Sequence, residues 1–133
     1  PICIFALYHN NESYCNPVPD RNIEVNIHDI QIRNVSCLAE NAVAIVGEGG
    51  NIQNILIDGI YYEKRKSDNS YLKGKKRIDV SPSKEDVTLP EDENEYWLLI
   101  DACRNISIRN ARTACYEGKS LKNAVRHSLE VEL

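Results

Sequence analysis

The sequence has no apolar run that approaches the ~20 residues needed for a membrane-spanning helix. It also has no excess of positive charge, because 16 Lys and Arg are outnumbered by 20 Asp and Glu, and the formal net charge is −4. Nucleic-acid-binding domains normally carry a basic surface. We therefore expect neither a membrane nor a nucleic acid as a partner.

Metal-ligand spacing is absent as well. No two of the five cysteines form a Cys-x-x-Cys pair, and the three histidines show no ligand spacing. We expect no metal and no cofactor. The state of the cysteines stays open between free buried thiols and a disulfide joining Cys37 to Cys115. The sequence therefore does not decide between a cytoplasmic and a secreted protein.

What the sequence does have is a nine-residue motif that occurs three times, at residues 27–35, 52–60 and 103–111. The copies start 25 residues (27 to 52) and 51 residues (52 to 103) apart, and periods in the twenties are typical of solenoids. Apolar residues occupy positions one, four, six and nine, which predicts a strand with one buried face. We expect these strands to stack in parallel, each covered by its neighbours.

Turn-forming residues flank the alternating pair in every copy. Asn and Gly tolerate the left-handed backbone region, so a tight bend with positive φ explains the residues at the strand end. Stacked Asn side chains could also bond their counterparts in the next repeat. The members of this turn ladder are Asp29, Asn54 and Asn105 at the third motif position and Asn34, Gly59 and Asn110 at the eighth.

A second strand is expected in each repeat. Residues 41–46 precede the second motif copy, and residues 96–101 precede the third. Residues 2–7 are the equivalent strand before the first copy, and residues 123–128 begin a further repeat. The chain thus contains strand, turn, strand and loop about three times over, with partial repeats at both ends.

Methionine is absent altogether, so the chain lacks an initiator residue, and neither end resembles the polar cap that solenoids normally carry. We interpret residues 1–133 as a single segment of a longer protein. The alternative is that another copy covers the open ends and gives a homo-oligomer, because an exposed sheet edge invites pairing.

Residues 63–95, between the second and third copies, are basic in their first half and acidic in their second. They contain few alternating apolar residues and two turn-forming X-Pro pairs. This composition predicts a charged, solvated loop inserted into the repeats. Long loops on rigid scaffolds often carry binding residues.

The stretch from Asn41 to Ile60 combines an apolar strand, a Gly-rich turn and a second strand. It resembles the repeats of the polygalacturonase-like glycoside hydrolases and their pectate-lyase-fold relatives, and the resemblance covers about residues 20–62 and 96–128. It implies an all-β fold: a right-handed parallel β-helix of about three coils, with partial coils at both ends and one long inserted loop. It also implies a polysaccharide or oligosaccharide partner, with uronate-containing polymers among the candidates.

In that family, paired carboxylates on an outward strand face hydrolyse the glycosidic bond. The family pattern contains Asn-x-Asp, Asp-Asp, Gly-His-Gly and Arg-Ile-Lys elements. This chain has no Asp-Asp pair; Glu40-Asn41-Ala42 replaces Gly-His-Gly, and Arg126-His127-Ser128 keeps only the Arg of the last element. The catalytic residues are therefore unknown, and we expect them upstream of this segment, which alone should be inactive.

The other outward positions carry no acid pair. On the strands that the resemblance makes catalytic, the expected outward residues are Ala44, Val46 and one of Leu98 or Leu99. The seventh motif position gives a second outward column, whose charges alternate in sign and predict a surface ion ladder. Its members are Arg33, Asp58 and Arg109.

Four residues are candidates for substrate binding: Arg126, Tyr62, Tyr96 and Trp97. Aromatic faces stack on sugar rings, and an arginine binds a uronate carboxylate. The alternative is that the aromatics fix the insertion to the body of the protein and that Arg126 is solvated. The leading hypothesis is a polysaccharide-acting β-helix protein. The alternative, from a different class, is a non-catalytic β-helix such as an adhesin or a phage tailspike-like module.

Overall fold

The structure is a computed structural model that describes residues 2–5, 26–40, 42–47, 50–65 and 96–133. These residues are all-β, and the described ranges hold no helix long and apolar enough to cross a membrane. The strands are β1 (Cys3–Phe5), β2 (Ile27–Ala39), β3 (Val43–Val46), β4 (Ile52–Lys64), β5 (Tyr96–Asp101), β6 (Cys103–Arg109), β7 (Arg112–Cys115), β8 (Lys122–Arg126) and β9 (Leu129–Glu132).

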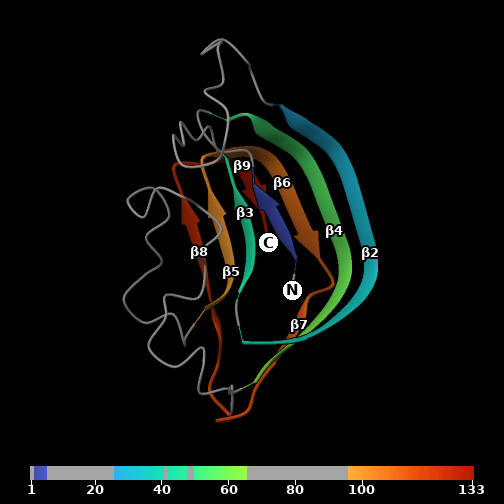
Figure 1. Cartoon of the computed structure of the whole chain (residues 1–133), viewed down its shortest axis with the longest axis vertical. Coiled ribbons are helices and arrows are strands. Elements are labelled where there is room, and N and C mark those ends of the chain that lie inside the picture. The colour runs from blue at the N-terminus through green and yellow to red at the C-terminus, as the bar shows by residue number, and fades with distance from the viewer. Residues whose placement is uncertain (1, 6–25, 41, 48–49, 66–95) are drawn as a thin grey trace, which may run out of the picture.

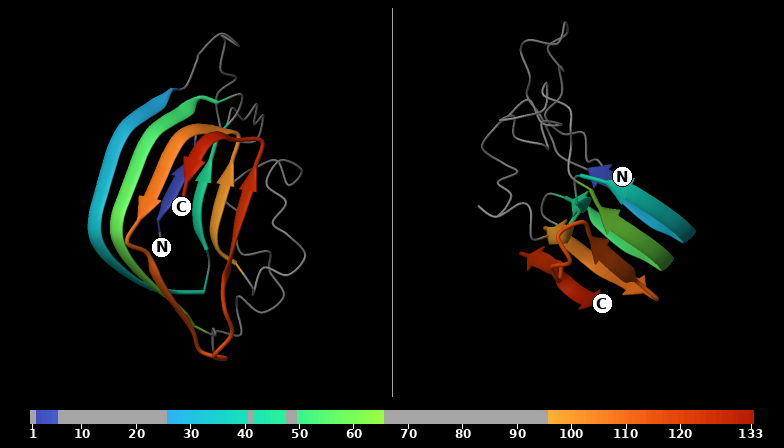
Figure 2. Two further views of the ribbon diagram at one scale, coloured as in Figure 1. Left: turned by 180° about the vertical axis from the view of Figure 1, so that it is seen from behind. Right: turned by 90° about the horizontal axis from the view of Figure 1, so that it is seen from below.

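The strands form two parallel sheets, with the orders β1-β3-β5-β8 and β2-β4-β6-β9, and β7 pairs with β4. Figure 1 shows the first sheet on one side of the molecule and the curved strands of the second on the other. Apart from β7, successive strands alternate between the sheets, so each pass of the chain contributes one tier. Each return to a sheet runs in the same direction, which makes neighbouring strands parallel. Figure 2 shows the tiers following one another from the N- to the C-terminal end.

The three motif copies lie side by side in the second sheet. Ile27 pairs with Ile52, and Ile52 with Cys103; the fourth and sixth motif positions are in register in the same way. This register confirms the alignment of the copies. The inward residues at these positions are at most 3% exposed in β4 and β6, so they form the core between the sheets.

Both β2 and β4 bend at two places. The φ angle is positive at all members of the turn ladder, between 52° and 59° at the Asx residues and 77° at Gly59. The paired register of β2 and β4 skips these positions, so each long strand consists of straight stretches joined at left-handed residues. The sequence predicted positive φ at the strand end; the structure has it at the third motif position as well.

A fourth copy of the motif, missed in the sequence, forms the last tier. β9 pairs with β6, matching Ile106 to Val131 and Ser107 to Glu132. The copy begins 25 residues after the third (103 to 128), and Glu130, with φ of 56°, occupies the third motif position. The copy is concealed in the sequence because Ser128 replaces the apolar residue at the first motif position and Glu130 replaces the Asx residue at the third.

The first sheet is apolar on both faces. Val43, Ile45, Leu98 and Ile100 face the core, while a separate buried cluster lies on the opposite face. Because parallel sheets are normally covered on both faces, their strands are apolar throughout rather than alternating. The outer cluster consists of Ala44, Val46, Leu99 and Ala124, with Tyr96 packed against it.

The predicted insertion at 63–95 begins later than its charge pattern suggests. Glu63 and Lys64 belong to β4, and Lys64 is only 2% exposed, with its Nζ donating a hydrogen bond to the Tyr96 carbonyl at 3.2 Å. The lysine stem packs in the interior while its ammonium reaches a polar partner. Residues 66–95, including the rest of the predicted loop, lie outside the described residues.

The disulfide considered between Cys37 and Cys115 is not formed, because both cysteines are free. Cys37 is in register with Tyr62 of β4, and Cys115 with Lys64 of the same strand. The strand β4 therefore lies between them, and two strand spacings, roughly 9–10 Å, exceed the reach of a disulfide.

Candidate functional site

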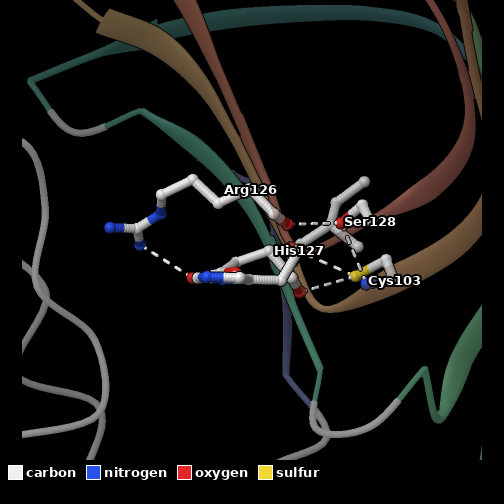
Figure 3. Close-up of polar contacts among 6 residues, drawn as sticks. Cys103, Arg126, His127 and Ser128 are labelled. Carbon is white, nitrogen blue, oxygen red and sulfur yellow. Dashed lines mark hydrogen bonds and ion pairs between the residues drawn. The ribbon is translucent and has the colours of Figure 1, made fainter.

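A polar corner, formed by Asp101, Arg126 and His127, lies where two strands of the first sheet end (Figure 3). β5 ends at Asp101 and β8 at Arg126, and the parallel register places these two residues side by side. An Arg126 guanidinium N–H donates to Asp101 Oδ2 at 2.8 Å. The other carboxylate oxygen, Oδ1, lies 2.9 Å from His127 Nδ1. One carboxylate thus joins two successive tiers.

The three side chains of the corner differ sharply in exposure. The Asp101 side chain is 13% exposed and that of Arg126 29%, whereas the His127 side chain is 81% exposed. Shielding from water strengthens the Asp101–Arg126 attraction relative to a surface pair. A carboxylate at Nδ1 orients the imidazole and leaves Nε2 available for proton exchange. Chemically, the corner offers one oriented imidazole rather than a pair of catalytic acids.

Two further side chains near the corner, the Cys103 thiol and the Ser128 hydroxyl, form hydrogen bonds with the backbone. The Cys103 thiol donates to the carbonyls of Asp101 (3.0 Å) and Ile45 (3.4 Å). The Ser128 hydroxyl donates to the Arg126 carbonyl at 2.8 Å and accepts the Cys103 N–H at 3.0 Å. Burial raises the pKa of the Cys103 thiol to about 11. A protonated, buried thiol is a poor nucleophile. These groups therefore hold the turn between sheets.

The predicted aromatic ligands occupy structural positions. Tyr62 is 0% exposed and Trp97 5%, and their ring centroids lie 6.0 Å apart in the core. Neither ring face can stack on a sugar in this structure, and burial raises the pKa of Tyr62 far above its usual range. Tyr96 packs against the outer cluster. The predicted ligand Arg126 binds Asp101, so the expectation of a solvated arginine is wrong.

The third motif position forms a hydrogen-bonded column on the exposed outer face of the second sheet. Asn105 donates to Asn54 at 2.8 Å, and Asn54 donates to Asp29 at 2.9 Å. The pKa of Asp29 is lowered, first by its hydrogen bond to His28 and then by the one from Asn54. These bonds lock adjacent tiers in register.

The predicted ion ladder is present in modified form. Arg33 and Asp58 approach to 3.5 Å, and Asp58 also accepts a hydrogen bond from Asn110 at 2.8 Å. Arg109 donates to Glu132 in the fourth copy at 2.9 Å, and this bond lowers the pKa of Glu132. Exposed pairs of this kind contribute little energy individually, so their main effect is on register.

Sequence reasoning missed Asp101, the centre of the corner. A signal for it exists: Asp101 and Arg126 are 25 residues apart, one repeat, and carry opposite charges. Within the described ranges, no group of three or more His, Cys, Asp or Glu residues is arranged to hold a metal ion. Comparison with protein-family models, curated proteins and solved structures gave no match to this chain.

Proposed function

We propose that the stacked tiers form a right-handed parallel β-helix. The proposal is supported by the alternation of strands between two parallel sheets, by the period of about 25 residues and by the side-chain columns that cross the tiers. The right-handed sense follows the strong preference of parallel crossover connections. On this proposal residues 1–133 are a single β-helix segment.

The function that the geometry supports best is that of a non-catalytic module, which binds polysaccharide and serves as a rigid scaffold. One observation carries the non-catalytic part of this proposal, while the polysaccharide partner is what the resemblance to the polygalacturonase-like repeats implies. The first sheet is the one on which the resemblance implies catalytic acids, yet its outer face is a buried apolar cluster. Aliphatic side chains cannot transfer protons.

The number of acidic residues in the same sheet also argues against hydrolysis. Hydrolysis of a glycosidic bond generally requires two carboxyl groups. Asp101 is the only acidic residue in β1, β3, β5 and β8, and it is held by Arg126 and His127. Both oxygens of the Asp101 carboxylate are engaged, one by Arg126 and the other by His127, and these four strands offer no second carboxyl group to act with it.

A polysaccharide hydrolase is the second candidate. It is favoured by the position of the corner, which places an oriented imidazole at the end of the same sheet. On this hypothesis the acid pair lies outside the described residues, in line with the expectation that it lies upstream. His127 would then assist proton transfer rather than supply the acid.

The two candidates are separated by measuring hydrolysis and binding on the same samples. The chain is incubated with oligogalacturonides and with neutral oligosaccharides, while reducing ends are assayed and binding is followed by isothermal titration calorimetry. We expect binding without release of reducing ends. Release that disappears in Asp101→Asn and in His127→Gln would favour the hydrolase, whereas absence of both binding and release would contradict both candidates.

A further inference from the structure

A third exposed face, here called the β7 face, is formed where β2 and β4 continue beyond their second bend, with β4 pairing with β2 on one side and with β7 on the other. Ser36 is in register with Tyr61, and Tyr61 with Arg112. In the next outward row, Leu38 is in register with Glu63. The alternation of side chains along a strand turns Tyr62 into the core and leaves Tyr61 outside. This face is separate from the polar corner.

Tyr61 presents an accessible ring in a fixed orientation. It is 38% exposed, and its hydroxyl donates a hydrogen bond to Glu63 Oε2 at 3.2 Å. Glu63 is held in turn, because its Oε1 accepts a hydrogen bond from Arg65 Nε at 3.0 Å. A ring that is already oriented loses less conformational entropy when a ligand stacks on it.

Arg112 differs from the other described arginines. Arg33, Arg65, Arg104, Arg109 and Arg126 each form an ion pair with a carboxylate. The exposed Arg112 forms no ion pair within the part of the chain that the structure describes. Its strand neighbour across the pair is Tyr61, and residues paired across adjacent strands lie about 5 Å apart. The Arg112 guanidinium, which has no carboxylate partner among the described residues, therefore lies beside the exposed ring of Tyr61.

We propose that Tyr61 and Arg112 form a subsite for a carboxylate-bearing sugar. The C–H groups of the sugar face meet the negative face of the Tyr61 ring. The planar guanidinium of Arg112 binds the sugar carboxylate through two parallel hydrogen bonds. Glu63, already fixed, accepts a hydrogen bond from a sugar hydroxyl. This inference rests on the proposed polysaccharide-binding function and names the class of sugar and the face that binds it.

The charge balance of the face favours an acidic sugar over a neutral one. In the row of Tyr61 the only charged side chain is Arg112, and Glu63 in the adjacent row is compensated by Arg65. A ligand with one anionic group therefore supplies the counter-charge that Arg112 lacks on this face. A sulfated sugar carries the same charge, so the experiment must separate a carboxylate from a sulfate.

The experiment titrates the chain with tri-galacturonate and follows binding by calorimetry and by amide NMR shifts. Its methyl ester tests the need for the carboxylate charge, and a sulfated oligosaccharide tests the alternative anion. We expect tri-galacturonate to bind and to shift amides of β4 and β7. The methyl ester should bind roughly tenfold more weakly, since it loses the charge-assisted bonds.

Single substitutions test whether Arg112 and Tyr61 form the subsite. Arg112→Gln should weaken tri-galacturonate binding roughly tenfold and bring it to the level of the methyl ester. Tyr61→Ala should weaken binding of both ligands, whereas Tyr61→Phe keeps the ring and should have a smaller effect. Arg104→Gln, which removes an exposed arginine of the second sheet, is the matched control and should bind like the unmodified chain. Thermal unfolding checks that each variant is folded.

The outcomes separate this inference from the proposed function. If tri-galacturonate binds and Arg112→Gln binds it equally well, the subsite is wrong while polysaccharide binding stands. Equal binding of the sulfated sugar overturns the preference for a carboxylate. If no oligosaccharide binds to the unmodified chain, the proposed function fails together with the subsite.

Discussion

Asn54 shows how a single residue serves two purposes in this protein. Its φ of 57° lies in the left-handed region, which Asn tolerates better than most residues. Its side chain also accepts a hydrogen bond from Asn105 and donates one to Asp29. The bend of β4 and the alignment of three tiers therefore depend on the same side chain.

We predict that Asn54→Ala lowers the free energy of unfolding by roughly 1–2 kcal/mol, because it adds backbone strain and removes two exposed hydrogen bonds. Asn54→Gly removes the same bonds but relieves the strain, so it should cost less. Urea unfolding of both variants measures the two contributions. Equal losses for Ala and Gly would show that the positive φ carries no cost at this position.

At the scale of the strand, the second bends of β2 and β4 pack directly on one another. A Cβ atom at Gly59 would lie 2.8 Å from the Asn34 side-chain oxygen, and Gly59 has a φ of 77°. Glycine is needed here for two reasons: the left-handed backbone and the close approach of the neighbouring strand. The side chain of one tier thus fills the space left by the missing side chain of the next.

Gly59→Ala should destabilise the protein by about 2 kcal/mol or more, since it combines left-handed strain with a steric clash. The matched control is Gly118→Ala, where φ is 68° but no atom lies within 4 Å of the added Cβ. The control should show the backbone cost alone, about 1 kcal/mol. Thermal or urea unfolding provides the comparison, and a larger loss at Gly118 would contradict the packing argument.

The strands also show where the sequence pattern was sufficient and where it was not. β5 has the expected bounds, because an uninterrupted apolar run between polar residues defines a buried strand. The charge pattern predicts a loop from Glu63 onward, since Glu63 and Lys64 interrupt the apolar pattern, but β4 continues to Lys64. Alternation from Ile60 places both Tyr62 and Lys64 inward. A lysine in that position makes sense only once the Tyr96 carbonyl is known to receive its ammonium.

At the scale of the whole molecule, the core is open at both ends of the stack. The inward residues of β2, such as Ile27, Ile30 and Ile32, are only partly buried, whereas their counterparts in β4 are at most 1% exposed. Val131 in the last tier is partly buried as well. Each tier is covered by its neighbours, so the first and last tiers expose apolar surface.

We predict that the isolated chain associates through these ends, and that light scattering shows a mass that rises with protein concentration. A head-to-tail contact that continues the register would place Glu130 of one copy beside Asp29 of the next. Screening by salt should therefore strengthen association. Ile30→Lys should abolish it, and Gln31→Lys, on the outward side of the same strand, is the control. A constant monomer mass at all concentrations would contradict the prediction.

The sequence by itself determined the period, the inward rows and the bend at the eighth motif position, because these depend on contacts that recur from repeat to repeat and so leave a repeated pattern of Ile, Asn and Gly. Only the tertiary structure decided which surfaces are open. Alternation separates the two sides of a strand but does not reveal what covers each side. The outer face of the first sheet proved to be buried, the aromatic candidates Tyr62 and Trp97 proved to be core residues, and the polar corner arose from residues in different tiers. Each of these features involves side chains that differ from one repeat to the next, so the recurring pattern of Ile, Asn and Gly does not predict them.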